Sequence, residues 1–219
     1  MSARRWPLAT LALCVLLPAL AAEAFKALLD EIGVQRVAVL GLSGGGPSAI
    51  RFVLQYPDRC AALVLESAIT MALEETPESQ DTDGIVDQFF QTEFGRWLFS
   101  DLFIEGMEKA APGNTKIHPM AEILVRSTYP FAMRDAGRLN DGHQFTRIPQ
   151  WPLEQIICPT LIIHGTADRN VPFSHAQRAH EAIAGSQLRA FDGGDHFISI
   201  TRSAEIDALV GEFVAAHAD

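Results

Sequence analysis

The chain has 219 residues, of which 48% are hydrophobic, and its formal net charge at pH 7 is −10. This length suits one domain, with room for an inserted subdomain, and the hydrophobic content is sufficient for a core. There are three lysines (Lys26, Lys109 and Lys116) and no basic cluster, so the composition argues against nucleic acid as a partner.

Residues 1–22 have the pattern of a secretory signal peptide. Two arginines precede an uncharged apolar run. Two small-x-small patterns that fit a cleavage site follow, Ala19-Leu20-Ala21 and Ala22-Glu23-Ala24. An uncleaved membrane anchor is the second interpretation, and a buried helix or a misplaced start is the third. The localisation is therefore left open between export, anchoring and the cytoplasm.

The next stretch predicts a short amphipathic helix over 23–32. Phe25, Leu28, Leu29 and Ile32 recur at helical spacing, so we expect these four side chains to face the core.

A strand predicted over 36–40 leads directly into Gly41-Leu42-Ser43-Gly44-Gly45, and a helical pattern follows until Tyr56. Gly-x-Ser-x-Gly between a strand and a helix is the pattern of a nucleophile elbow. The turn is so sharp that neighbouring side chains would collide, and its strain holds the Ser43 hydroxyl clear of the backbone. The Gly44 N–H is then placed to stabilise an oxyanion. The alternative interpretation is a glycine-rich turn with an idle serine.

The rest of the chain alternates strands and helices around an insertion. Apolar runs at 61–65, 159–165 and 187–191 predict strands, and helical patterns cover 173–183 and the C-terminal segment. This order indicates a parallel sheet with helices on both faces.

Residues 71–155 form the predicted insertion. It begins with a polar loop over 74–84, continues with aromatic-rich helical pieces, and ends with a loop over 138–152. The aromatic-rich pieces suit an ordinary helical core or a helical cap over an apolar pocket.

Two polar residues follow predicted strands and complete a candidate triad with Ser43. Asp168 lies after the strand at 159–165, and His196 lies after the last strand, beside two glycines. Loops at the C-terminal ends of parallel strands converge on one edge of a sheet. The order Ser, Asp, His is the one that accompanies a nucleophile elbow.

Other residues near these loops have alternative interpretations. Asp168 by itself suits a turn cap, and Glu66 is the second candidate for the acid. We expect His164 to be packed inside its strand. We expect Asp192 and Asp195 to shape the loop before His196 or to support the catalytic residues from behind.

The cysteines do not predict a metal site. Cys60 and Cys158 each adjoin an apolar run and are interpreted as small core residues rather than as a bridge or ligands. The sequence predicts neither a metal nor a cofactor.

The elbow at Ser43, the acid loop ending at Asp168 and the base loop around His196 together resemble the α/β-hydrolase superfamily from about Glu23 to the C-terminus. The resemblance implies that 23–70 and 156–219 form the hydrolase core and that 71–155 is a cap. A serine at the elbow implies acyl-type chemistry on esters, lactones, thioesters, amides or some carbon–carbon bonds. The predicted function is a serine hydrolase of small, mostly apolar carboxylic esters or related acyl compounds.

The chain departs from the family pattern before the elbow. Only 36 residues precede the elbow strand, whereas the family has several strands there and a loop that supplies a second oxyanion donor. The alternative function is therefore an inactive or impaired hydrolase fragment, or a binding module. The uncovered elbow strand also predicts self-association through the edge of the sheet.

Overall fold

The computed structural model describes residues 18–74, 101–102, 104–109 and 135–217. Four strands form one parallel sheet in the order β1-β2-β3-β4, which confirms the predicted fold class. The strands are β1 (Val37–Leu42), β2 (Cys60–Glu66), β3 (Thr160–Gly165) and β4 (Gln187–Phe191). The helices are α1 (Pro18–Glu31), η1 (Ser43–Gly45), α2 (Gly46–Gln55), η2 (Pro57–Arg59), α6 (Asp135–Phe145), η6 (Leu153–Gln155), α7 (Ser174–Ala182), α8 (Ile198–Thr201) and α9 (Ser203–Ala216).

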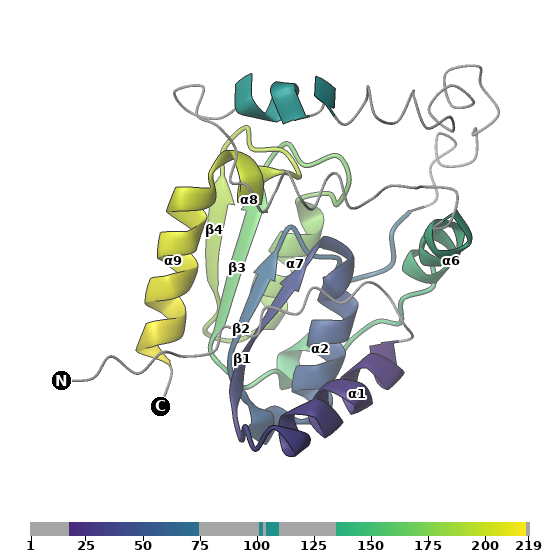
Figure 1. Cartoon of the computed structure of the whole chain (residues 1–219), viewed down its shortest axis with the longest axis vertical. Helices are drawn as coiled ribbons and strands as arrows, with labels where there is room; N and C mark the ends of the chain where they lie inside the picture. The colour runs from purple at the N-terminus through teal and green to yellow at the C-terminus, as the bar shows by residue number, and fades with distance from the viewer. Residues whose placement is uncertain (1–17, 75–100, 103, 110–134, 218–219) are drawn as a thin grey trace.

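Helices cover both faces of the sheet, as Figure 1 shows for α9 on one side and α1, α2 and α7 on the other. Every residue of β2 and β3 is buried. Leu63 and Leu65 pack with residues of α1, α2 and α7, whereas Ala62 and Val64 pack with residues of α8 and α9. Burial on both faces explains why β2 and β3 each carry a continuous apolar run instead of alternating apolar and polar residues.

Helix α1 begins five residues earlier than predicted and presents a different face to the core. Ala22 and Leu29 are buried, but Leu28 and Ile32 are 41% and 54% exposed, so the prediction that both face inward is wrong. The small Ala22 side chain is fully buried in the cluster that includes residues of α2. The end of the signal-like segment predicted at residue 22 falls inside this helix.

The predicted insertion is described only in part. Residues 101–102 and 104–109 are helical, and α6 occupies 135–145, so the loop predicted over 138–152 is wrong for its first eight residues. Polar residues and two glycines interrupt the apolar positions of α6, so its sequence lacks a continuous apolar stripe and suggests a loop. Most of the predicted polar loop and aromatic-rich pieces lie outside the described residues.

Within the described parts of the chain, no helix has both the length and the apolar character needed to cross a bilayer. Residues 1–17 lie outside these parts.

Candidate active site

Ser43 occupies a strained turn between β1 and α2. Its φ of 49° lies in the left-handed region, which non-glycine residues rarely adopt. A Cβ at Gly41 would lie 2.8 Å from Cβ of Ala49, and one at Gly46 would lie 2.3 Å from the carbonyl oxygen of Ile69. Gly41 therefore lets β1 and α2 approach closely, and Gly46 lets α2 begin against the segment that follows β2. Gly46 is a requirement that the elbow pattern by itself does not include.

Backbone hydrogen bonds hold the turn against the segment that follows β2. The Ser43 carbonyl accepts a hydrogen bond from Ile69 N–H at 3.0 Å. Gly44 lies in the first turn of η1, where backbone N–H groups have no acceptor within the helix. The Gly44 N–H therefore occupies the position that is expected of an oxyanion donor.

His196 lies between the serine and an aspartate that come from different strands. Its Nε2 is 2.9 Å from Ser43 Oγ, and its Nδ1 is 2.8 Å from Asp168 Oδ2. A carboxylate only accepts hydrogen bonds, so Nδ1 carries the proton and Nε2 is free to accept the serine hydroxyl. The fold brings together the three residues that the sequence singled out.

Asp168 is held in its ionised form. Its side chain is fully buried, and Oδ1 accepts hydrogen bonds from the backbone N–H groups of Asn170 and Val171, each at 2.9 Å. Burial raises the pKa of Asp168, but hydrogen bonds from His164, His196 and Val171 outweigh burial and hold the pKa well below its usual range. The carboxylate therefore carries its charge at neutral pH.

His164 is a neighbour of Asp168. The sequence analysis predicted only that it would be packed inside its strand. It is buried, as expected, and its Nε2 lies 2.8 Å from the carbonyl of Val171 and 3.3 Å from Asp168 Oδ2. Because the carbonyl only accepts, Nε2 is protonated and is also placed to donate to Asp168. His164 is near the end of β3 and four positions before Asp168, and this short separation is the signal in the sequence that could have revealed the contact.

The acid loop and the base loop are joined by one backbone hydrogen bond and one hydrogen bond to a side chain. Ala167 N–H donates to the Gly194 carbonyl at 2.9 Å, and Gly193 N–H donates to Thr166 Oγ1 at 2.9 Å. A Cβ at Gly165 would lie 2.2 Å from the Gly194 oxygen, so only glycine permits this approach. These contacts set the position of Asp168 relative to His196.

The two aspartates near His196 belong to the loop rather than to the relay. Asp195 Oδ1 accepts the Phe197 N–H at 2.9 Å, and Asp192 Oδ1 lies 3.4 Å from Thr166 Oγ1. Both contacts confirm the prediction that these residues shape the loop.

Glu66 is not hydrogen-bonded to His196, although it was the second candidate for the acid. It is buried at the end of β2, and its Oε1 has no hydrogen-bond partner among the described residues. Burial is the largest effect on the pKa of Glu66 and raises it to about 7, although a hydrogen bond from Ser199 lowers it. The Asp207 carboxylate raises this pKa and His196 lowers it.

Phe145, at the end of α6, lies against the elbow. A Cβ at Gly44 would be 2.7 Å from Phe145 Cζ, and the Phe145 carbonyl accepts a hydrogen bond from Leu73 N–H at 2.9 Å. An apolar ring therefore stands beside the expected oxyanion donor, in a stretch where the sequence predicted a loop.

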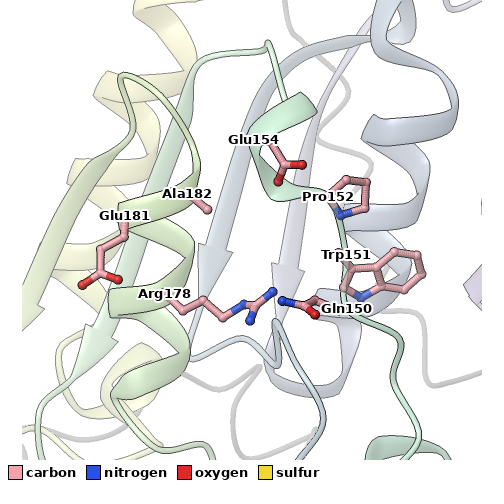
Figure 2. A pocket seen from close by; sticks show the side chains of 7 residues that line it. All are labelled: Gln150, Trp151, Pro152, Glu154, Arg178, Glu181 and Ala182. Atoms are coloured by element: carbon pink, nitrogen blue, oxygen red, sulfur yellow. The ribbon is translucent and has the colours of Figure 1, made fainter.

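A separate surface cavity of about 540 Å³ lies between the segment before β3 and α7 (Figure 2). Trp151 Nε1 and Arg178 Nε are buried there without hydrogen-bond partners among the described residues. None of Ser43, Asp168 and His196 lines this cavity. Within the described residues, no group of three or more His, Cys, Asp or Glu side chains is placed to hold a metal ion.

Known proteins resemble this chain over most of its length. A family model described as alpha/beta hydrolase fold matches residues 19–203. The uncharacterized hydrolase YcgS of Bacillus subtilis is 30% identical over 199 residues, which cover 81% of this chain and 67% of that protein. The 2-hydroxy-6-oxo-2,4-heptadienoate hydrolase of Pseudomonas putida is 28% identical over 200 residues, with 86% and 67% covered.

A solved structure agrees with these relatives. The alpha/beta hydrolase fold protein from Nakamurella multipartita has a TM-score of 0.66 and 26% identity, and the match covers 90% of this chain and 75% of that protein. This chain thus spans about two thirds of the length of the two relatives above.

Proposed function

The chain belongs to the α/β-hydrolase fold family, and on that premise we propose that it hydrolyses small, mostly apolar carboxylic esters or related acyl compounds. Ser43 is the proposed nucleophile, His196 the base and Asp168 the acid. The observation that carries the proposal is the continuous relay of 2.9 Å from Ser43 to His196 and 2.8 Å from His196 to Asp168.

The proposed reaction has two steps. His196 Nε2 takes the proton from the Ser43 hydroxyl as the oxygen attacks the substrate carbonyl, and the ionised Asp168 stabilises the resulting imidazolium. The Gly44 N–H stabilises the oxyanion, and protonation of the leaving group by His196 gives an acyl-enzyme. Water activated by His196 then attacks the acyl carbon, which releases the acid and restores the serine.

Phe145 supports an apolar substrate. Its ring contacts the position of Gly44, so an acyl group attached to Ser43 would lie near an aromatic surface. We therefore propose small acyl chains for this site, with the second oxyanion donor still to be assigned.

The test is labelling of the full chain by a fluorophosphonate, together with turnover of p-nitrophenyl butyrate. We expect Ser43→Ala to abolish labelling and to lower kcat by on the order of 10⁶, because the three residues act as a unit. Ser186→Ala is a matched control, since Ser186 Oγ also lies 2.9 Å from a histidine nitrogen, Nδ1 of His180. No carboxylate pairs with His180 in the described structure, so this variant should be labelled like the parent.

The alternative function is a hydrolase fragment or binding module without turnover. Its support is that the Gly44 N–H is the one oxyanion donor assigned among the described residues. Folded protein that the probe does not label at Ser43 would favour this alternative over the enzyme.

A second candidate substrate comes from the Pseudomonas putida relative, which is named a 2-hydroxy-6-oxo-2,4-heptadienoate hydrolase. We propose this compound as the second substrate to test. The loss of absorbance of its conjugated chromophore would measure its turnover. Turnover of the dienoate above that of the ester, lost in Ser43→Ala, would favour cleavage of a carbon–carbon bond.

A further inference from the structure

Two cysteines that the proposed function does not use contact each other at the edge of the sheet where β2 and β3 begin. Cys60 begins β2 and Cys158 lies two residues before β3, and their sulfurs are 3.2 Å apart. Both are buried and both are free thiols. The sequence analysis interpreted them separately as core residues, because 98 positions separate them.

The strand pairing fixes this contact. Leu63 N–H donates to the Pro159 carbonyl at 2.9 Å, and Thr160 Oγ1 donates to the Cys158 carbonyl at 3.0 Å. Both side chains belong to the same core cluster. The sulfurs would need to approach by only about 1 Å to reach the length of a disulfide.

The two thiols differ in the direction of their pKa shifts and in their exposure to solvent. The hydrogen bond from Cys60 Sγ lowers the pKa of Cys158, and the nearby Arg36 charge also lowers it. The same hydrogen bond, together with burial, raises the pKa of Cys60. Cys158 is also nearer to solvent, since it is 8% exposed against 1% for Cys60 and follows Ile157, which is 77% exposed.

We propose that Cys60 and Cys158 are a modification site at which a peroxide installs a disulfide between β2 and the segment that enters β3. The Cys158 thiolate attacks one peroxide oxygen, which breaks the O–O bond, releases hydroxide and leaves a sulfenic acid on Cys158. The Cys60 sulfur then attacks the sulfenic sulfur, and the S–O bond breaks. Counting the proton that the hydroxide takes up, two thiols and one hydrogen peroxide give one disulfide and two waters.

The cross-link has a defined consequence for the fold. It closes a loop that contains the whole predicted insertion, residues 71–155, and it lies where β2 begins. Ser43 follows the opposite end of β1, which runs parallel to β2, so the cross-link and the proposed catalytic residues lie at opposite edges of the sheet. The disulfide should therefore stabilise the chain without blocking Ser43.

The experiment uses the full chain with Cys14→Ser, which leaves only this pair. The reduced folded protein is treated with hydrogen peroxide and its peptides are mapped by mass spectrometry without reduction. We expect the peptides of Cys60 and Cys158 to be joined with the loss of two hydrogens. We also expect the midpoint of thermal unfolding to rise by about 10 °C and to return with dithiothreitol.

Matched variants separate the proposed steps. Cys60→Ser should leave a sulfenic acid on Cys158 that dimedone traps, whereas Cys158→Ser should leave Cys60 unmodified in the folded protein. Neither variant should show the thermal shift. Two free thiols after treatment, or a sulfonic acid on Cys158 beside a free Cys60, would overturn the proposal.

Discussion

His164 Nε2 lies 3.3 Å from Oδ2 of Asp168, the same oxygen that is 2.8 Å from His196 Nδ1. Two histidines from different parts of the chain therefore share one buried carboxylate oxygen. His164 does not reach the serine, so we interpret it as a positioning residue that stabilises the ionised acid and orients it toward His196.

Removing the His164 donor should weaken the proposed relay without unfolding the site. We expect His164→Leu to lower kcat/KM by roughly tenfold, because a hydrogen bond to a charged group contributes about 1.5–3 kcal/mol and Asp168 keeps three other donors. The pKa of Asp168 should rise because one donor to its carboxylate is lost, so the NMR titration profile of this carboxyl should move to higher pH. His164→Gln, which retains an N–H donor, should restore most of the activity. Equal profiles for the Leu and Gln variants would contradict this role.

The elbow should tolerate no side chain at residue 41. We expect Gly41→Ala to destabilise the fold by about 1–3 kcal/mol, because the new Cβ would lie 2.8 Å from that of Ala49. Urea unfolding measures the change. A Cβ at Gly211 in α9 meets no atom within 4 Å, so Gly211→Ala should be neutral or stabilising. The double variant Gly41→Ala with Ala49→Gly should recover part of the loss, and strict additivity of the two changes would contradict a direct clash.

The buried Glu66 should make stability depend on pH. Its pKa is raised to about 7 in the folded chain, from an ordinary value of 4.5, so the folded state holds a proton that the unfolded state releases between these values. Stability therefore falls as pH rises through this window, by up to about 3 kcal/mol. Glu66→Gln removes this fall. Between pH 5 and pH 8 the variant should therefore lose about 2–3 kcal/mol less of its free energy of unfolding than the parent loses.

Urea unfolding at the two pH values checks this prediction. Glu181→Gln is the control because Glu181 is an exposed carboxylate on α7. His175 contributes in the opposite direction in both proteins, since burial lowers its pKa to about 4 and stability is lost as pH falls from 6.5 toward that value. Parallel pH dependences for the parent and Glu66→Gln would show that Glu66 is not the responsible group.

We propose that the chain self-associates through β1. Within the described sheet β1 pairs with β2 alone, and Ala38 on it is exposed. Sedimentation velocity should show association that increases with concentration, and Ala38→Lys should reduce it because a charge on an edge strand opposes pairing. Ala204→Lys adds the same charge to an exposed position on α9 and should leave association unchanged. Monomer at every concentration would refute the proposal.

The sequence by itself determined that the strands form a parallel sheet, and it identified the three candidate residues. The glycines around Ser43 indicate a tight turn, which is a local property of the backbone. The apolar run in β2 indicates a strand that is buried on both faces. Both signals are complete within a few consecutive residues, so they can be interpreted without knowing what packs nearby.

Only the tertiary structure decided the contacts between distant segments. The shared oxygen of Asp168, the approach of Cys60 to Cys158 and the contact of Phe145 with Gly44 each join residues that no local pattern relates. The prediction of which face of α1 is buried was wrong for the same reason. Leu28 and Ile32 have the helical spacing of core residues, but the position of α2 decides which side of the helix is covered. Periodicity specifies that a helix has an apolar side, but the neighbouring elements determine which side chains lose contact with water.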